Sequence, residues 1–271
     1  MKVAAIQMVS STALDDNLRV ARELLEQAAL GGAELAVLPE YFCLMGYKDT
    51  DKLALRETAG SGVIQQFLAD TARALQIWIV GGTLPMATDA PDRVRNTTLV
   101  FDSTGACVAR YDKIHLFRFS NGAEQYDEGR VIDAGDTPVQ FDLQARSGQR
   151  WRVGLSVCYD LRFPELYRAH ARAGADLLLV PSAFTHTTGQ AHWEVLLRAR
   201  AVENLAYVLA PAQGGVHANG RHTWGHSMLV DPWGSILAQR DQGAGVVAGE
   251  LDAQRLSAVR AQLPALTHRV L

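Results

Sequence analysis

Three residues of types that enzymes use in catalysis stand at comparable places along the chain. Glu40, Lys113 and Cys158 each follow a short apolar segment and open a long loop. A carboxylate, an ammonium and a thiol brought together are suited to nucleophilic acyl transfer. The carboxylate would take the thiol proton, and the thiolate would attack a carbonyl carbon. The ammonium and the backbone N–H after the cysteine would stabilise the oxyanion.

Each residue taken singly has a simpler interpretation. Glu40 or Lys113 alone is more often a surface charge at a strand end, and Cys158 alone is more often a buried cysteine. The sequence around the cysteine favours chemistry, because residues 150–157 alternate like a strand and Pro164 is suited to the first turn of a helix. A helix N-terminus near a thiol stabilises the thiolate, so we expect the pKa of Cys158 to be lowered.

Other possible sites are weaker. Ser156 lies in a Gly-x-Ser-x-Cys stretch, whereas a nucleophile elbow ends in Gly. His217, His222 and His226 show no metal-ligand spacing, and we interpret them as solvated or structural. Gly81-Gly82 lacks the G-x-G-x-x-G pattern of a dinucleotide site. We therefore expect no bound metal and no cofactor.

Composition limits the classes of partner. The 271 residues carry a net charge of −3 without a basic run, so we expect no nucleic-acid partner. No window holds about 18 uninterrupted apolar residues, so we expect no membrane span. The three cysteines form an odd set without C-x-x-C spacing, which argues against a disulfide framework and a thiolate zinc site. We expect a reducing compartment, the cytoplasm.

Strand-like and helix-like segments must position the three candidates. Residues 2–8, 15–30 and 34–38 predict a strand, a helix and a second, parallel strand. Residues 95–111 and 137–157 each predict a hairpin around a turn. With 48% hydrophobic residues and no linker or repeat, residues 1–271 are predicted to form one α/β domain. Two mixed sheets would pack face to face, with helices on their outer faces.

The later part of the chain returns to an α/β rhythm. We expect helices over 164–173 and 190–206, a short helix near 252–262, and one strand over 222–230. The second helix carries a row of apolar residues that predicts its buried side: Val195, Leu196, Ala199, Val202 and Leu205.

Three blocks of the sequence closely resemble the catalytic blocks of the nitrilase superfamily of carbon–nitrogen hydrolases. They are Leu38–Glu40, Tyr111–Phe117 and Cys158–Glu165, in the family's order and separation. The resemblance covers essentially the whole chain and implies an α-β-β-α sandwich. It also implies hydrolysis of linear amides without a cofactor, by a homodimer or a larger homo-oligomer.

The resemblance assigns roles to individual residues. Glu40 would be the general base, Lys113 the acid and oxyanion stabiliser, and Cys158 the nucleophile that forms a thioester. The amide of Tyr159 would complete the oxyanion hole. Glu128, which precedes Asp133-Ala134-Gly135, matches a further family glutamate that holds the lysine; the alternative is a surface carboxylate.

Within the superfamily, residues 181–234 look most like the Nit branch, which contains deaminated glutathione amidase and ω-amidase. We expect deaminated glutathione as the substrate, with ω-amidase action on 2-oxoglutaramate or succinamate as the alternative. Nitrile or carbamoyl cleavage, and a catalytically idle scaffold, are further alternatives. A substrate carboxylate calls for a fixed guanidinium, and Arg162 is the candidate unless it pairs with Glu165. Phe184 is a packing residue or a wall of the pocket.

Two departures from the family pattern affect the site and the assembly. Residues 117–127 form a longer loop than is usual before the second glutamate, which bears on the shape of the pocket. The chain also stops at Leu271, short of the tail that many family members carry, which bears on the oligomer interface.

Overall fold

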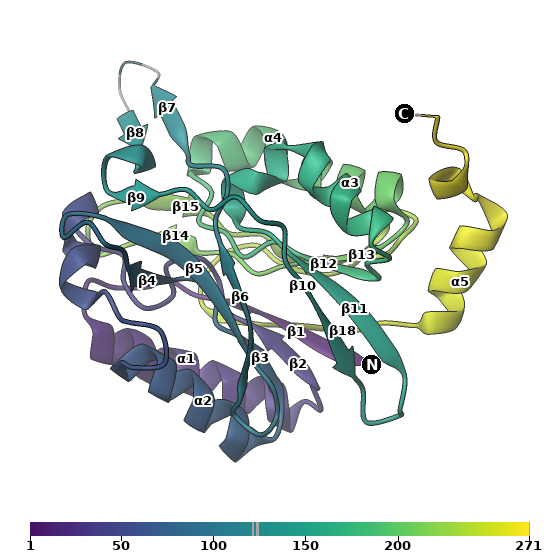
Figure 1. Ribbon diagram of the computed structural model, residues 1–271, viewed down its shortest axis with the longest axis horizontal. Coiled ribbons are helices and arrows are strands. Elements are labelled where there is room, and N and C mark those ends of the chain that lie inside the picture. The colour runs from purple at the N-terminus through teal and green to yellow at the C-terminus, as the bar shows by residue number, and fades with distance from the viewer. Residues whose placement is uncertain (121, 123–124, 271) are drawn as a thin grey trace.

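The computed structural model describes residues 1–120, 122 and 125–270. Two mixed β-sheets pack face to face, with α1 (Leu14–Leu30) and α2 (Val63–Leu75) outside one sheet and α3 (Pro164–Arg172) and α4 (His186–Asn204) outside the other (Figure 1). This α-β-β-α sandwich confirms the predicted fold class. Residues 121, 123 and 124 of the 117–127 loop, and Leu271, lie outside the described residues.

The first sheet has the strand order β18-β1-β2-β3-β5-β4, and β6 and β9 also pair with β5. β1 and β2 are parallel and joined by α1, as the opening of the sequence predicts. β5 and β6 form the first expected hairpin. The strands of this sheet are β1 (Lys2–Gln7), β2 (Leu35–Val37), β3 (Trp78–Val80), β4 (Leu84–Ala87), β5 (Val94–Phe101), β6 (Cys107–Asp112), β9 (Ile132–Asp133) and β18 (Gly245–Glu250).

The second sheet has the strand order β10-β11-β12-β13-β16-β17. β10 and β11 form the second expected hairpin, and β11, β12 and β13 run parallel with α3 and α4 as crossovers. Its strands are β10 (Gln140–Gln144), β11 (Arg150–Leu155), β12 (Leu177–Leu179), β13 (Tyr207–Ala210), β16 (Ser227–Val230) and β17 (Ile236–Arg240).

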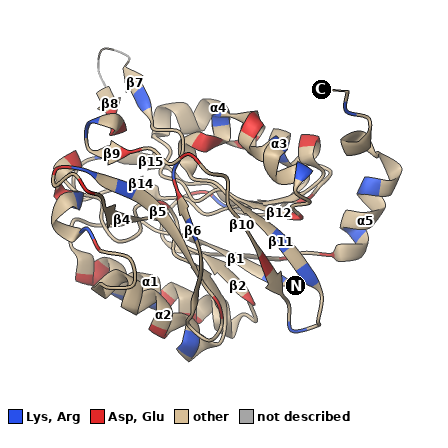
Figure 2. Cartoon of the chain, in the orientation of Figure 1, with Lys and Arg blue, Asp and Glu red and all other residues tan. Residues whose placement is uncertain are grey.

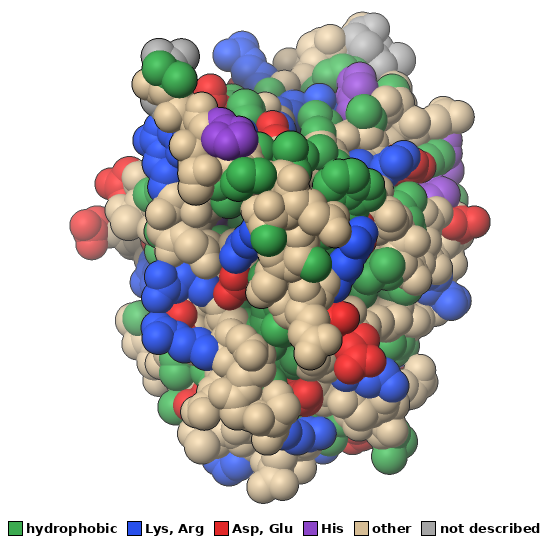
Figure 3. Space-filling model, turned by 90° about the vertical axis from the view of Figure 1, so that its right-hand side faces the viewer, with side chains coloured by type: hydrophobic (Ala, Val, Ile, Leu, Met, Phe, Trp, Pro, Cys, Tyr) green, Lys and Arg blue, Asp and Glu red, His purple; other side chains and the backbone are tan. Residues whose placement is uncertain are grey.

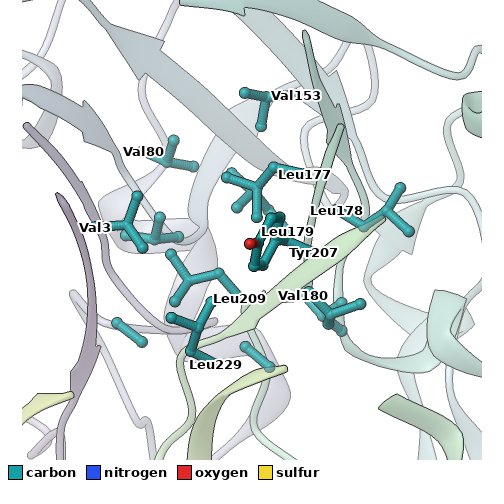
Figure 4. Close-up of a cluster of buried hydrophobic side chains, with 14 of the residues drawn as sticks. Val3, Val80, Val153, Leu177, Leu178, Leu179, Val180, Tyr207, Leu209 and Leu229 are labelled. Atoms are coloured by element: carbon teal, nitrogen blue, oxygen red, sulfur yellow. The ribbon is translucent and has the colours of Figure 1, made fainter. Parts of the chain in front are cut away.

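The main core lies between the two sheets. Val3 and Val80 from the first sheet share one buried cluster with Val153, Leu177 and Leu209 from the second (Figure 4). The strands read as nearly continuous apolar runs because helices cover their other faces. In β1, for example, Val3 and Ala5 face the second sheet, whereas Ala4 and Ile6 join a separate cluster with residues of α1 and α2. The two faces follow from the alternation of side chains along a strand.

The predicted buried side of α4 is wrong for Val195 and Val202, which are 62% and 44% exposed, whereas Leu205 is buried and Leu196 packs against the core as predicted. The buried residues of this helix also include Trp193, Leu197 and Ala201. The buried side also includes polar residues that have partners: Arg200 donates hydrogen bonds to the carbonyl oxygen of Leu161. The apolar pattern misled because buried polar groups that are hydrogen-bonded are tolerated in a core.

The expected strand over residues 222–230 is two strands. β15 (His222–Trp224) pairs with β14 (Gly214–Val216) in a small separate sheet, and β16 joins the second sheet. The chain changes direction at Gly225 and His226, which both have positive φ. A Cβ at Gly225 would lie 2.2 Å from the carbonyl oxygen of Asp241, so glycine is required there.

The two long loops contain short elements that the sequence pattern did not predict. Residues 41–60 include a 3₁₀ helix, Asp49–Leu55, and residues 114–136 include the pair β7 (Arg118–Ser120) and β8 (Gln125–Asp127) and a 3₁₀ turn, Glu128–Arg130. The last helix, α5 (Ala253–Gln262), lies beside the sandwich rather than over a sheet face (Figure 1). Arg260 binds it there through the Leu205 carbonyl oxygen and Asp176.

Charged side chains of both signs are spread over the elements (Figure 2), and on the face shown in Figure 3 they are interspersed with hydrophobic ones. Among the helices that the structure describes, none has the length and apolar character needed to cross a membrane.

Candidate functional site

The three residues singled out from the sequence meet where the two sheets lie together. Glu40 follows β2 and Lys113 follows β6, both in the first sheet, and Cys158 follows β11 in the second. Glu40 and Lys113 are each 1% exposed and Cys158 is 8% exposed. A site assembled from both sheets is held by the inter-sheet core, so its geometry depends on the packing of the whole sandwich.

Glu40 has a donor on each carboxylate oxygen. Lys113 Nζ lies 2.8 Å from Oε1, and Asn96 Nδ2 donates to the same oxygen at 3.0 Å. The backbone N–H of Ala183 donates to Oε2 at 3.0 Å, and the Cys158 thiol hydrogen-bonds the carboxylate. These contacts fix the carboxylate beside the sulfur, which is the arrangement a proton acceptor needs.

Glu128 holds the other side of the lysine. Lys113 Nζ lies 2.8 Å from Glu128 Oε2 and 3.0 Å from Oε1. Tyr41 Oη donates to Oε1 at 2.7 Å, and the Phe117 N–H donates to Oε2 at 2.7 Å. The alternative of a surface carboxylate is wrong, because the side chain of Glu128 is 13% exposed. One buried ammonium therefore lies between two carboxylates.

The charges of this group shift its pKa values in a consistent pattern. Burial raises the pKa of Glu40, although the charge of Lys113 opposes the shift. Burial would lower the pKa of Lys113, but the charges of Glu128 and Glu40 overcome burial and raise it well above the usual value. Burial would raise the pKa of Glu128, but Lys113 lowers it instead. The resting site holds an ammonium, an ionised Glu128 and a Glu40 that is more basic than an ordinary carboxylate.

The expectation of a lowered thiol pKa is wrong. Burial, followed by the charge of Glu40, raises the pKa of Cys158 well above its usual value. Cys158 begins a 3₁₀ helix of its own, Cys158–Arg162, and its N–H donates to the Pro181 carbonyl oxygen instead of lying ahead of a free helix end. The resting cysteine is a thiol, so its activation requires the neighbouring base.

Asp160 is a residue of the site that the sequence reasoning missed. It is fully buried, and Oδ2 accepts hydrogen bonds from the Val157 N–H at 2.8 Å and from Tyr111 Oη at 2.6 Å. Oδ1 accepts from the His115 N–H at 3.0 Å and lies 2.7 Å from His115 Nδ1. Asp160 thus connects the turn that carries Cys158 to the segment that carries Lys113. Its only signal in the sequence is a charge two residues after the cysteine.

Two cavities open on Cys158. The larger is lined by Glu40, Glu128, Lys52 and Arg221 among others. The smaller is lined by Tyr159, Arg162, Phe184, Thr185 and Thr188. Phe117, Cys158 and Thr185 line both cavities. The site is therefore forked, with the thiol at the junction.

The remaining candidates lie in or near the smaller cavity. The Arg162 guanidinium lies 5.8 Å from the centre of the Tyr159 ring and 5.7 Å from that of Phe184. Its Nη2 atom is 3.2 Å from His192 Nδ1. Among the described residues Arg162 has its side-chain hydrogen bond with His192 and no carboxylate within 4 Å, so the alternative of a pair with the exposed Glu165 is wrong.

The weaker sites of the sequence have structural roles. Ser156 Oγ donates to the Leu179 carbonyl oxygen and lies 2.7 Å from Tyr167 Oη, so it is occupied in the core. His217 lies between the Ser10 carbonyl oxygen and Thr223 Oγ1. In the described part of the chain, no cluster of three or more metal-ligating side chains is found.

Comparison with known proteins places this geometry in a family. Residues 2–261 match the family described as carbon–nitrogen hydrolase. The chain belongs to this family. The resemblance to the nitrilase superfamily is thereby confirmed, and the chain is a carbon–nitrogen hydrolase.

Individual relatives extend over nearly the whole chain. It is 44% identical to deaminated glutathione amidase of Synechocystis sp., covering 98% of this chain and 97% of that protein. The crystal structure of the Caenorhabditis elegans NitFhit protein superposes with a TM-score of 0.89 at 36% identity, over 99% of this chain and 65% of that one. A mutant amidase from Nesterenkonia sp., with acrylamide added at its active-site cysteine, superposes with a TM-score of 0.77 at 28% identity, over 97% of this chain and 98% of that one.

Proposed function

We propose that this carbon–nitrogen hydrolase is an amidase that cleaves deaminated glutathione into 2-oxoglutarate and cysteinylglycine. One observation carries the chemistry: the Cys158 thiol, the Glu40 carboxylate and the Lys113 ammonium form one buried hydrogen-bonded group beside a cavity. The name of the Synechocystis relative and the resemblance of residues 181–234 support the substrate.

In the first half of the reaction, Glu40 takes the thiol proton while the sulfur of Cys158 forms a bond to the amide carbon. The carbonyl electron pair moves to oxygen, where the Lys113 ammonium and the Tyr159 N–H stabilise the negative charge. The intermediate then collapses and the C–N bond breaks. The resemblance implies Lys113 as the acid, but the charges of Glu128 and Glu40 raise the pKa of Lys113 well above its usual value, so we assign the acid role to Glu40. Glu40 returns its proton to the leaving nitrogen, and the acyl group remains on sulfur as a thioester.

In the second half, water replaces the amine. Glu40 takes a proton from the water as its oxygen bonds to the thioester carbon. The C–S bond breaks, the carboxylic acid leaves, and Glu40 returns the proton to the Cys158 sulfur. A carboxylate with a raised pKa suits both duties, because it must gain and lose a proton near neutral pH. Glu128 keeps Lys113 charged and in place throughout.

Arg162 would bind the carboxylate of the acyl part. It lies on the smaller cavity, held between the Tyr159 and Phe184 rings, and it has no acidic partner within 4 Å among the described residues. A guanidinium fixed by two rings costs little ordering when it binds a carboxylate.

The test is hydrolysis of deaminated glutathione beside 2-oxoglutaramate, succinamate and a panel of nitriles and carbamoyl amides. We expect the highest kcat/KM for deaminated glutathione, and mass spectrometry should trap an acyl group on Cys158. Cys158→Ala should abolish turnover, and Cys107→Ala, at an exposed cysteine, should leave it unchanged.

Other outcomes would replace the proposal. Much faster turnover of 2-oxoglutaramate would make the protein an ω-amidase, and selective turnover of a nitrile or a carbamoyl compound would assign that chemistry. No turnover and no acyl-enzyme with any compound would favour the idle scaffold. We further propose that the protein works in the cytoplasm, because its nucleophile must stay reduced.

A further inference from the structure

The larger and the smaller cavity, which meet at Cys158 and form the two arms of the site, are both lined by cationic side chains. Arg162 lies on the smaller cavity, and Lys52 and Arg221 lie on the larger one. Lys52 comes from the 3₁₀ helix Asp49–Leu55, and Arg221 comes from the turn between β14 and β15. Residues from separate parts of the chain thus place positive charge on both sides of the nucleophile.

Lys52 and Arg221 are held by uncharged groups. Lys52 Nζ lies 4.9 Å from the centre of the Tyr41 ring, and the Arg221 guanidinium lies 5.2 Å from that of Tyr126. Arg221 Nη1 is 3.8 Å from Met45 Sδ. In the described residues neither cation has a carboxylate within 4 Å, so each retains the capacity to bind an anion.

The acidic residues of the same cavity do not remove this capacity. Glu128 is committed to Lys113 and Tyr41, and Glu40 to Lys113 and Cys158. Asp127 lies 3.9 Å from Arg118 and 3.8 Å from Arg130. Asp49 is the remaining acid, on the same short helix as Lys52. Burial lowers the pKa of Lys52. A bound anion would offset this effect, because a nearby negative charge favours the charged form of a lysine.

The position of Glu40 decides which part of an amide occupies which arm. Glu40 must return its proton to the leaving nitrogen, so the leaving group lies on the side where Glu40 is exposed to the cavity. Glu40 lines the larger cavity only, whereas Tyr159 and Arg162 line the smaller. The acyl part therefore enters the smaller arm, and the leaving amine enters the larger arm toward Lys52 and Arg221.

We propose that Lys52 and Arg221 form a second carboxylate subsite, which binds the carboxylate of the leaving amine while Arg162 binds that of the acyl part. This inference rests on the proposed amidase function and narrows its substrate class. The preferred substrates are amides that carry a carboxylate on both sides of the scissile bond. An amide whose leaving group is ammonia leaves the subsite empty.

The experiment varies the substrate and the protein together. The substrates are deaminated glutathione and its analogue in which the C-terminal glycine carboxylate is capped as an amide. For Arg221→Gln and for Lys52→Gln we expect kcat/KM to fall about 10- to 100-fold with the free carboxylate and less than about threefold with the capped analogue. Arg162→Gln should lower kcat/KM for both substrates by similar factors. Arg19→Gln, on the surface of α1, is the matched control and should change kcat/KM for neither substrate.

Equal losses on both substrates for Arg221→Gln and Lys52→Gln would overturn the subsite. If Arg162→Gln lowers kcat/KM for deaminated glutathione but not for the capped analogue, the assignment of the two arms is overturned. Arg221→Lys, which keeps the charge, should recover part of the activity, and circular dichroism should show that each variant is folded.

A binding measurement separates this inference from the proposed function. Alanylglycine, which has the length of the leaving dipeptide but no thiol, should slow alkylation of Cys158 by iodoacetamide more than its C-terminal amide does. Arg221→Gln should remove the difference. Protection by both compounds alike would overturn the subsite even if deaminated glutathione is hydrolysed. Selective protection without hydrolysis of deaminated glutathione would retain the subsite and reject the proposed substrate.

Discussion

At the scale of single residues, the site depends on placing one ammonium between two carboxylates out of reach of bulk water. Removing one partner of a buried ion pair leaves an uncompensated charge, which costs several kcal/mol, so the group acts as a unit. Lys113 has Glu40 on one side and Glu128 on the other. Burial, with a further contribution from the charge of Glu128, raises the pKa of Glu40 although the charge of Lys113 opposes the shift. Burial of the neighbouring Cys158 then keeps the proton on sulfur until a substrate arrives.

The raised pKa of Glu40 predicts the acid limb of the activity profile. Protonation removes the base, so kcat/KM should fall as pH decreases through the pKa of Glu40. Because that pKa is raised, the fall should occur above the ordinary carboxyl value of about 4.3. Initial rates between pH 4 and pH 8 at low substrate concentration measure it.

A charge change beside Glu40 checks the assignment. The charge of Glu128 raises the pKa of Glu40, so in Glu128→Gln the remaining activity should have its acid limb at lower pH. Glu165→Gln, at an exposed carboxylate on α3, should leave the limb in place. An acid limb at the same pH in all three proteins would show that another group controls it.

At the scale of elements, Asp160 joins the strand ends that carry the nucleophile and the lysine. In Asp160→Asn, an NH₂ group replaces one of the two carboxylate oxygens. If it replaces Oδ2, the N–H of Val157 and the hydroxyl of Tyr111 face a donor; if it replaces Oδ1, the N–H of His115 does. We expect kcat/KM to fall at least about tenfold and unfolding to become easier by about 1–3 kcal/mol. Kinetics and urea unfolding of the same preparation measure both, and unchanged kinetics in a destabilised protein would limit Asp160 to stability.

Helix α3 can approach β11 because Gly154 has no side chain. A Cβ at Gly154 would lie 2.8 Å from Cγ of His170, which is buried and whose Nε2 atom is 2.8 Å from the Leu155 carbonyl oxygen. Gly154→Ala should therefore destabilise the fold by about 1–3 kcal/mol.

Removing the ring supplies the control for this contact. In the double variant that carries both Gly154→Ala and His170→Ala, the added Cβ no longer meets the ring. The loss of unfolding free energy in the double variant should therefore be smaller than the sum of the losses in the two single variants. Additive losses would mean that the substitution acts elsewhere than at the ring.

At the scale of the whole molecule, α4 presents apolar side chains to solvent, which supports the homo-oligomer that the resemblance implies. Val202→Asp should shift the protein toward the monomer, because a charge at an apolar interface must lose its hydration. Val108→Asp on β6 is a matched control, since Val108 is 45% exposed and Val202 is 44% exposed. Sedimentation velocity measures the result, and a wild-type monomer would reject the assembly. That residues 1–271 form one domain stays a prediction as well.

The sequence by itself predicted helices α1, α3, α4 and α5 and the hairpins β5–β6 and β10–β11, because burial on both faces leaves apolar runs and amphipathic helices leave a 3.6-residue period. It also singled out Glu40, Lys113, Cys158 and Glu128, whose types and order form a recognisable set. Their catalytic roles stay a proposal. The pattern of apolar residues could not predict the break in the 222–230 segment, because the break depends on the close approach of Gly225 to the chain at Asp241.

Only the tertiary structure decided the electrostatics and the shape of the site. A helix N-terminus after Cys158 suggested a thiolate, but burial and the nearby Glu40 outweigh it, and neither is visible in the local sequence. Lys52 and Arg221 are far apart in the sequence and belong to one cavity because the loop after β2 and the β14–β15 turn lie on the same side of the sandwich. The pKa of an ionisable group and its access to a ligand depend on the groups that surround it in space, and the packing of both sheets determines those surroundings.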